Sequence, residues 1–101
     1  MPCDVEVTDQ FGRWYEDLSH DEQLSVEHVV NLLTEKGVAL GHPYSSAIHG
    51  SRHGHMRELR IQHEGRPYRI LYAFDPRRMA ILLIGGLRSA GRLSLHYRRH
   101  R

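Results

Sequence analysis

The sequence predicts an α/β chain of the α+β type, in which an antiparallel sheet carries an N-terminal helical hairpin on one face. Three observations predict this class. Apolar residues recur at helical spacing between residues 9 and 36, and they alternate at strand spacing between residues 56 and 84. The length of 101 residues suits one domain, because domains usually take roughly 100–200 residues. We therefore expect a single domain over residues 1–101.

The N-terminal segment is expected to form a strand followed by a short helix. Val5 and Val7 alternate with polar residues, as in a strand with one buried face. A helix beginning near Asp9 then places four large side chains on one stripe, namely Phe11, Trp14, Tyr15 and Leu18. This aromatic stripe is interpreted as core rather than as a surface on which bases stack.

A second helix is predicted from the residues at its two ends. Ser19 and Glu22 have the spacing of a capping box, which marks a helix start. Lys36 and Gly37 are typical of a helix end, where a cation faces the negative end of the helix dipole and glycine tolerates a left-handed conformation. A second apolar stripe lies between these ends, at Val26, Val29, Val30 and Leu33. The two helices should form an antiparallel hairpin joined at Ser19.

The second half of the chain is expected to supply most of the sheet. Residues 41–55 are rich in Gly, His, Ser and Pro and lack periodicity, which predicts an exposed connection. Three strands should follow, over residues 56–63, 67–75 and 79–84, and Gly85-Gly86 should stop the last one. Residues 87–101 then form an atypical basic tail, interpreted either as a short edge strand or as a poorly ordered segment.

Charge is divided unequally along the chain. Residues 1–50 hold two basic and nine acidic side chains, a net charge of −7, whereas residues 51–101 hold twelve arginines against three acids, a net charge of +9. Arginine presents a planar fork of donors that suits phosphate. The basic half therefore points to a polyanion or an acidic protein as partner, and a solvated basic surface without a partner is the alternative.

Several classes of protein are excluded by what the sequence lacks. The only cysteine, Cys3, rules out an intramolecular disulfide and a zinc site built on several thiolates. No apolar run is long enough to span a membrane, and the first residues do not resemble a secretory signal, so we expect a cytoplasmic protein without membrane contact. His49, His53 and His55 lie close together, but their spacing on a Gly-rich loop is not a recognised ligand arrangement. No metal site and no cofactor are expected.

An arginine cluster is the main candidate for a functional site. Arg60 and Arg69 fall on the polar faces of two strands joined by a tight turn, so both side chains should project from the same side of the sheet. Arg57, Arg66 and Arg88 could join them from the strand ends. Such a cluster could hold a phosphodiester through bidentate contacts. The alternative is that these arginines pair with Glu58, Glu64 and the acidic helices.

Cleavage of RNA would also require a general base and a general acid. Arginine is a poor base because its pKa exceeds about 12. The candidates are therefore Glu58, His63 and Tyr97, each of which could also be a solvated residue on an exposed face.

Five segments of the chain resemble the RelE/HigB superfamily of toxins, and more narrowly its phage-derived host-inhibition branch. They are Trp14 with Leu18, Lys36-Gly37-Val38, Arg57-Glu58-Leu59-Arg60-Ile61, the strand over residues 68–75, and Ile81-Leu82-Leu83-Ile84-Gly85-Gly86. The resemblance implies a compact α/β fold with a basic groove. It also implies the toxin of a type II toxin–antitoxin system, an mRNA endoribonuclease that acts on the translating ribosome. The implied partners are mRNA, the ribosome and a cognate antitoxin, expected to be a helix-turn-helix protein.

The resemblance also implies roles for individual residues. Arg60, Arg69 and Arg88 match basic positions of the family and are expected to be catalytic, and Tyr97 or His96 could stand in for the catalytic residue that members have near the end, with Tyr97 taken as the candidate. Independently of the resemblance, Arg57 and Arg66 at the strand ends and His63 are expected to contact RNA. The tail at 87–101 departs from the family pattern, because it is Arg-rich where family members close with a helix. The alternative function is therefore a non-catalytic family member that binds an antitoxin or another acidic protein.

Overall fold

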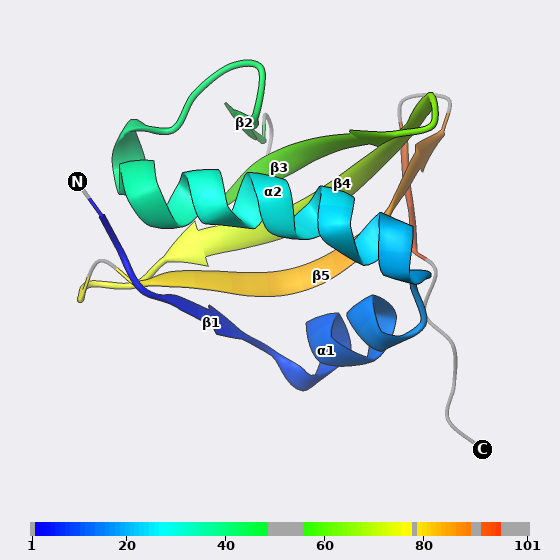
Figure 1. Ribbon diagram of the computed structural model, residues 1–101. Helices are drawn as coiled ribbons and strands as arrows, with labels where there is room; N and C mark the ends of the chain where they lie inside the picture. The colour runs from blue at the N-terminus through cyan, green and yellow to red at the C-terminus, as the bar shows by residue number, and fades with distance from the viewer. Residues whose placement is uncertain (1, 49–55, 78, 90–91, 96–101) are drawn as a thin grey trace.

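Six strands form one mixed sheet, and two helices cover part of it (Figure 1). The computed structural model describes residues 2–48, 56–77, 79–89 and 92–95. The elements follow the order β1 (Val5–Val7), α1 (Asp9–Glu16), α2 (His20–Lys36), a 3-10 turn (Gly37–Ala39), β2 (Ser45–Ala47), β3 (Met56–His63), β4 (Arg66–Phe74), β5 (Ala80–Ser89) and β6 (Arg92–Leu95). This order confirms the predicted α+β class and its N-terminal pair of helices.

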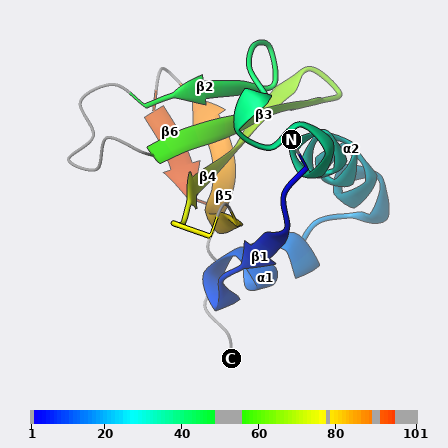
Figure 2. The ribbon, with the colours of Figure 1, turned by 90° about the vertical axis from the view of Figure 1, so that its left-hand side faces the viewer.

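The strands lie in the order β1-β5-β4-β3-β2, with β6 paired to β5. All neighbours are antiparallel except β1, which runs parallel to β5 with Val5 opposite Ala80. At this edge the sheet therefore differs from the antiparallel sheet predicted from the sequence. The reason is the connection, since both helices separate β1 from the next strand and the chain re-enters the sheet far from β1. In the turned view of Figure 2 strands β2 to β6 lie at the upper left, with α2 to their right and with β1 and α1 below them.

Helix α1 begins after Thr8, whose side chain accepts from the backbone N–H of Phe11 at 3.1 Å. The predicted aromatic stripe is core, because Phe11 and Trp14 are buried and pack with the sheet. Trp14 lies so close to β5 that a Cβ on Gly85 would come 2.3 Å from its Cε3 atom. The expectation that Gly85-Gly86 ends the strand is therefore wrong. Gly85 allows the indole to approach, and β5 continues to Ser89.

Helix α2 has both of the predicted ends. Ser19 and Glu22 form a reciprocal capping box, with hydrogen bonds of 3.1 and 2.7 Å. The helix ends at Gly37, whose φ of 58° lies in the left-handed region. The buried residues of α2 pack with those of β3, β4 and β5 in one core, which includes Val26, Val29, Leu33, Leu59, Ile61, Ile70, Tyr72 and Leu82.

The segment after α2 includes a buried residue and a short strand that its composition does not indicate. Within the predicted exposed connection, Ser45 is fully buried and begins β2, which pairs antiparallel with β3. Burial of this serine is possible because its hydroxyl hydrogen-bonds to Tyr72 Oη at 2.5 Å. Residues 49–55, which complete that connection and contain the three clustered histidines, lie outside the described residues.

Candidate nucleic-acid interface

The turn between β3 and β4 fixes the positions of the two central arginines. Glu64 and Gly65 both have positive φ angles, 51° and 79°, as a tight two-residue hairpin turn requires. This turn sets a register in which Arg60 lies directly opposite Arg69. Because side chains alternate along a strand, both arginines project from the face opposite to Leu59 and Ile70, and thus away from the helices. The predicted convergence of Arg60 and Arg69 is present.

Glu58 lies between these two arginines. Arg60 Nη1 donates to Glu58 Oε1 at 3.2 Å, and Arg69 Nε lies 3.8 Å from the same oxygen. Arg69 also donates through Nη1 to the carbonyl of Tyr68 at 2.9 Å. Only 7% of the Arg69 side chain and 9% of Glu58 are exposed, against 35% of Arg60. One carboxylate thus orients two guanidinium groups, and the three side chains carry a net charge of +1. We call them the Arg60–Glu58–Arg69 cluster.

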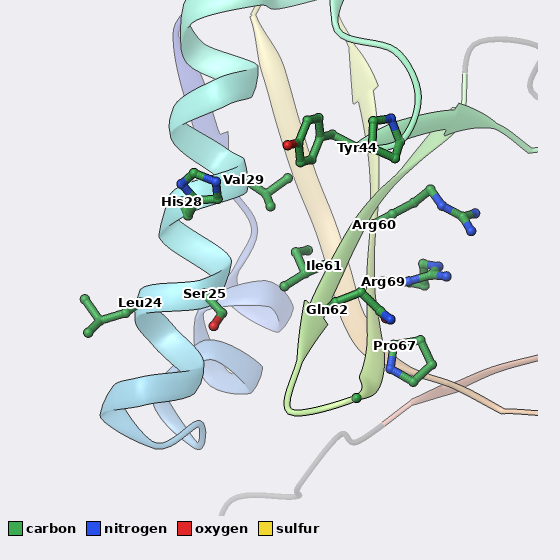
Figure 3. Close-up of a pocket in the computed structure, with 12 residues that line it drawn as sticks. Leu24, Ser25, His28, Val29, Tyr44, Arg60, Ile61, Gln62, Pro67 and Arg69 are labelled. Atoms are coloured by element: carbon green, nitrogen blue, oxygen red, sulfur yellow. The ribbon is translucent and has the colours of Figure 1, made fainter.

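A groove of about 720 Å³ adjoins this cluster (Figure 3). One wall is α2, where Leu24, Ser25, His28 and Val29 line it. Its other lining residues come from the segment before β2, from β3, from the β3–β4 turn and from the start of β4, namely Pro43, Tyr44, Arg60, Ile61, Gln62, Gly65, Pro67 and Arg69. Figure 3 shows Arg60 and Arg69 extending to the same side, away from α2. The groove therefore connects a helix wall of mixed polarity with the two converging arginines.

Arg57 lies on the opposite, helix-facing side of the sheet. Its Nε donates to the Ser45 hydroxyl at 2.9 Å, and that hydroxyl also bonds to Tyr72. The position follows from alternation, because Arg57 is two residues before the buried Leu59. Arg57 thus belongs to a buried polar network and is not brought beside Arg60.

Arg66 also lies on the helix-facing side. Its Nη2 donates to Tyr68 Oη at 2.8 Å and to Glu22 Oε2 at 3.3 Å, and its guanidinium lies 5.5 Å from the centre of the Tyr68 ring. The Tyr68 hydroxyl donates to the same Glu22 carboxylate, and this bond lowers the pKa of Glu22. Burial together with the bond to Glu22 raises the pKa of Tyr68 to about 12. These contacts join the start of β4 to the first turn of α2.

His63 lies between α2 and the end of β3. Its Nδ1 hydrogen-bonds to Ser25 Oγ at 2.8 Å, and its ring packs edge-on against Tyr68 at 6.0 Å. Its side chain is 12% exposed. The structure therefore separates Arg57, Arg66 and His63 from the Arg60–Glu58–Arg69 cluster, and their predicted contacts with RNA stay predictions.

Comparison with known proteins assigns the chain to a family. Residues 13–95 match the family model described as "Phage derived protein Gp49-like (DUF891)". The chain belongs to the Gp49-like family. This membership confirms the phage-derived branch that the sequence motifs indicate, and the matched range includes both arginines of the cluster.

Two curated relatives of this Gp49-like protein come from Mycobacterium tuberculosis (strain ATCC 25618 / H37Rv). One, named "Putative toxin HigB2", is 41% identical over 96 residues, which are 94% of this chain and 46% of that protein. The other, named "Putative toxin HigB3", is 43% identical over 77 residues, which are 76% of this chain and 66% of that protein. The chain therefore spans about half the length of the first relative and just under two thirds of the second.

A solved structure shares the fold of this Gp49-like protein. A chain in the crystal structure of the archaeal RelE–RelB complex from Pyrococcus horikoshii OT3 superposes with a TM-score of 0.64 at 15% identity. The match covers 89% of this chain and 99% of that chain. The likeness shows that the predicted RelE-like fold is present.

The remaining predicted site residues belong to the C-terminal segment. The backbone of Arg88 lies in β5, two residues beyond Gly86, which is the cross-strand neighbour of Arg69. Tyr97 and His96 lie outside the described residues. Part of the predicted basic tail forms β6, so the edge-strand interpretation holds for Arg92–Leu95.

The described residues show neither a metal site nor a membrane-spanning helix. In this part of the chain, no group of three or more His, Cys, Asp or Glu side chains is placed to hold a metal ion. No helix there is long and apolar enough to cross a membrane.

Sequence reasoning missed the groove residues on the α2 side. Tyr44 lies in the segment interpreted as an exposed connection, and Leu24 and His28 of α2 belong to neither of the apolar stripes used to predict the helices. One signal was available, because an aromatic residue after Pro43 in an otherwise polar segment needs a surface to pack against. The position of that surface depends on how β2 pairs with β3, and the composition of the segment does not predict this pairing.

Proposed function

We propose that this protein is the toxin of a type II toxin–antitoxin system and that it cleaves mRNA on the translating ribosome. The observation that carries the proposal is the Arg60–Glu58–Arg69 cluster, in which two arginines meet on one face and line one groove. Family membership, the toxin names of both relatives and the fold shared with the RelE–RelB chain support it. Such a protein acts in the cytoplasm.

In the proposed mechanism the cluster holds the scissile phosphate. Arg60 is the more exposed guanidinium and makes the first contact, while the buried Arg69 supplies a fixed charge behind it. Charges fixed before the reaction stabilise the extra negative charge of the transition state without reorganising. A single donor of this kind contributes about 2.7–4 kcal/mol.

Glu58 is the general base in this proposal. Its carboxylate takes the proton of the ribose 2′-hydroxyl, whose oxygen then attacks the adjacent phosphorus. The bond from phosphorus to the 5′-oxygen breaks, leaving a 2′,3′-cyclic phosphate, and the departing oxygen receives a proton from a general acid. Tyr97 is the acid proposed from the sequence, with Arg88 as a further contact to phosphate. No cofactor takes part in these steps.

The proposed partner is an antitoxin that masks the cluster. Clustered arginines are costly to desolvate without opposite charges, so the masking segment must carry carboxylates. A helix-turn-helix antitoxin with an acidic segment fits this requirement. The alternative, a family member that binds such a partner without cutting RNA, is favoured by one observation, because Glu58 already neutralises part of the charge of both arginines.

The proposal is tested by inducing the protein in bacterial cells and following growth and mRNA cleavage. Arg69→Ala should lower cleavage by about a hundredfold, since ~2.7 kcal/mol corresponds to about that factor. Arg60→Ala and Glu58→Gln should also relieve growth arrest, and the matched control Arg77→Ala, whose guanidinium pairs with Asp75 just after β4, should not. Folding of each variant is checked by circular dichroism, and Arg69→Lys provides a second test if Arg69→Ala does not fold.

Two outcomes would contradict the proposal. Growth arrest by folded Arg69→Ala and Arg60→Ala at the wild-type level would show that the cluster is not the active site. A wild-type protein that neither arrests growth nor cleaves mRNA on translating ribosomes would support the non-catalytic alternative instead.

A further inference from the structure

The groove beside the cluster has an aromatic side chain that the proposed chemistry does not use. Tyr44 is 36% exposed although it is a large ring, and it lines the groove with Val29 of α2. Figure 3 shows the Tyr44 ring extending from its segment toward Val29, while Arg60 points to the other side of β3. The groove thus extends from the Tyr44 ring and Val29, past the edge of β3, to the two guanidinium groups, all of which line it.

The open edge of β3 lies in the same groove. Strand β2 pairs with β3 from Arg57 to Leu59. At the next residue of β3, the backbone N–H of Arg60 donates to the carbonyl of Tyr44 at 2.8 Å. In the described part of the chain, no strand pairs with β3 beyond that point on this side. Because backbone groups alternate along a strand, the N–H and C=O of Gln62 face the same way as those of Arg60. An adjacent donor and acceptor of the backbone therefore face the groove.

We propose that this groove binds one unstacked base of the RNA, next to the phosphate held by Arg60 and Arg69. The Tyr44 ring stacks on or packs against the base, and the Gln62 backbone hydrogen-bonds to its edge. The inference rests on the proposed function and adds to it the place where the protein contacts a base. Single-stranded RNA is recognised in this way elsewhere, by aromatic stacking combined with hydrogen bonds to base edges.

The dimensions favour a base over an added peptide strand. Between Tyr44 and the turn at Gly65, only Gln62 presents both of its backbone groups to the open edge, so an added strand would gain few hydrogen bonds. The volume of about 720 Å³ lies within the range of about 300–1,000 Å³ that small-ligand pockets have. Arg60 and Arg69 line the same groove, so one nucleotide can place its base and its phosphate in contact at once.

The test measures binding of single-stranded pentaribonucleotides that are 2′-O-methylated, so that no cleavage occurs. Each position is made abasic in turn, and the Kd is measured for the wild type, Tyr44→Ala and Tyr44→Phe. Loss of the one base that occupies the groove should weaken wild-type and Tyr44→Phe binding by about five- to a hundredfold. The same loss should have little effect on Tyr44→Ala, which lacks the ring. Val38→Ala, exposed elsewhere on the surface, is the matched control.

A second pair of variants tests the backbone contact. Gln62→Pro removes an N–H that faces the open edge, where proline is tolerated, and Gln62→Ala keeps that N–H. Folded Gln62→Pro should lose the preference for an RNA with the base present, and Gln62→Ala should retain it. The Tyr44 variants decide the question by themselves if Gln62→Pro does not fold.

The outcomes separate this inference from the proposed function. Equal loss of affinity in the wild type and Tyr44→Ala at every abasic position would overturn the inference and leave the phosphate site intact. Unchanged RNA binding by Tyr44→Ala, with weaker co-purification of the antitoxin, would assign the groove to a protein partner and also overturn it. A wild-type protein that binds no RNA would overturn both proposals.

Discussion

The two faces of the sheet hold arginine in two different ways. On the helix-facing side, Arg57 and Arg66 donate to neutral hydroxyl groups and to the carboxylate at the start of α2. On the opposite face, Arg60 and Arg69 converge on Glu58 and line a groove. The first pair connects elements of the fold, whereas the second gathers charge at one place.

This difference shows that a count of basic residues does not locate a binding surface. Twelve arginines in residues 51–101 give a large positive charge, but alternation along β3 and β4 distributes the arginines between two faces. If the two faces of the sheet have these different roles, substitutions on the helix-facing side change stability, and substitutions in the Arg60–Glu58–Arg69 cluster change function.

The largest expected effect on stability comes from the apolar part of the helix-facing side. Ile70 is fully buried, so Ile70→Ala should lower the free energy of unfolding by about 2–5 kcal/mol, measured by urea denaturation. Leu71, the next residue, lies half-buried on the other face and is the matched control. An equal loss in Leu71→Ala would contradict the assignment of the core to one face.

The next effect concerns the buried polar network beneath β2. Tyr72→Phe removes the hydroxyl that bonds to Ser45, and the free energy of unfolding should fall by about 1–3 kcal/mol. Tyr44→Phe removes the hydroxyl of a residue that is 36% exposed and should leave stability unchanged. Denaturation of both variants measures the difference, and unchanged stability in Tyr72→Phe would show that this network does not stabilise the fold.

A smaller effect should appear as a pH dependence of stability. The pKa of Glu22 is lowered, first by the hydrogen bond from Tyr68, so its ionised form is stabilised in the folded state. This stabilisation is complete above the ordinary pKa of 4.5 and is lost as the pH falls below it. Compared with Glu22→Gln, the wild type should therefore lose more of its free energy of unfolding between neutral and acidic pH. If the free energies of unfolding of the two proteins decreased equally with falling pH, the ionised Glu22 carboxylate would not stabilise the folded state.

The sequence predicted most of the fold because the signals were local. The capping box at Ser19, the stripe containing Trp14 and the alternation of β3 and β4 each depend on a few neighbouring residues. The parallel pairing of β1 with β5 and the burial of Ser45 depend on residues far apart in the chain, which local patterns do not specify.

The candidate site was predictable in part for the same reason. The shared side of Arg60 and Arg69 was predicted from alternation on two strands joined by a tight turn, and the observed turn at Glu64 and Gly65 sets the register that places them opposite each other. Alternation alone would also have placed Arg57 with Leu59, and Arg66 with Tyr68, on the helix-facing side. Tyr44 could not be placed, because its position in the groove depends on how β2 docks against β3.

The most direct test of the comparison is the salt dependence of RNA binding by wild type, Arg60→Ala and Arg66→Ala. Each phosphate neutralised on a single strand contributes about 0.7 to the slope of log K against log salt. Arg60→Ala should reduce the magnitude of the slope by about that amount, and Arg66→Ala should keep the wild-type slope. A reduced slope in Arg66→Ala, with no change in Arg60→Ala, would contradict the account by placing the phosphate contact at Arg66 and not at the Arg60–Glu58–Arg69 cluster.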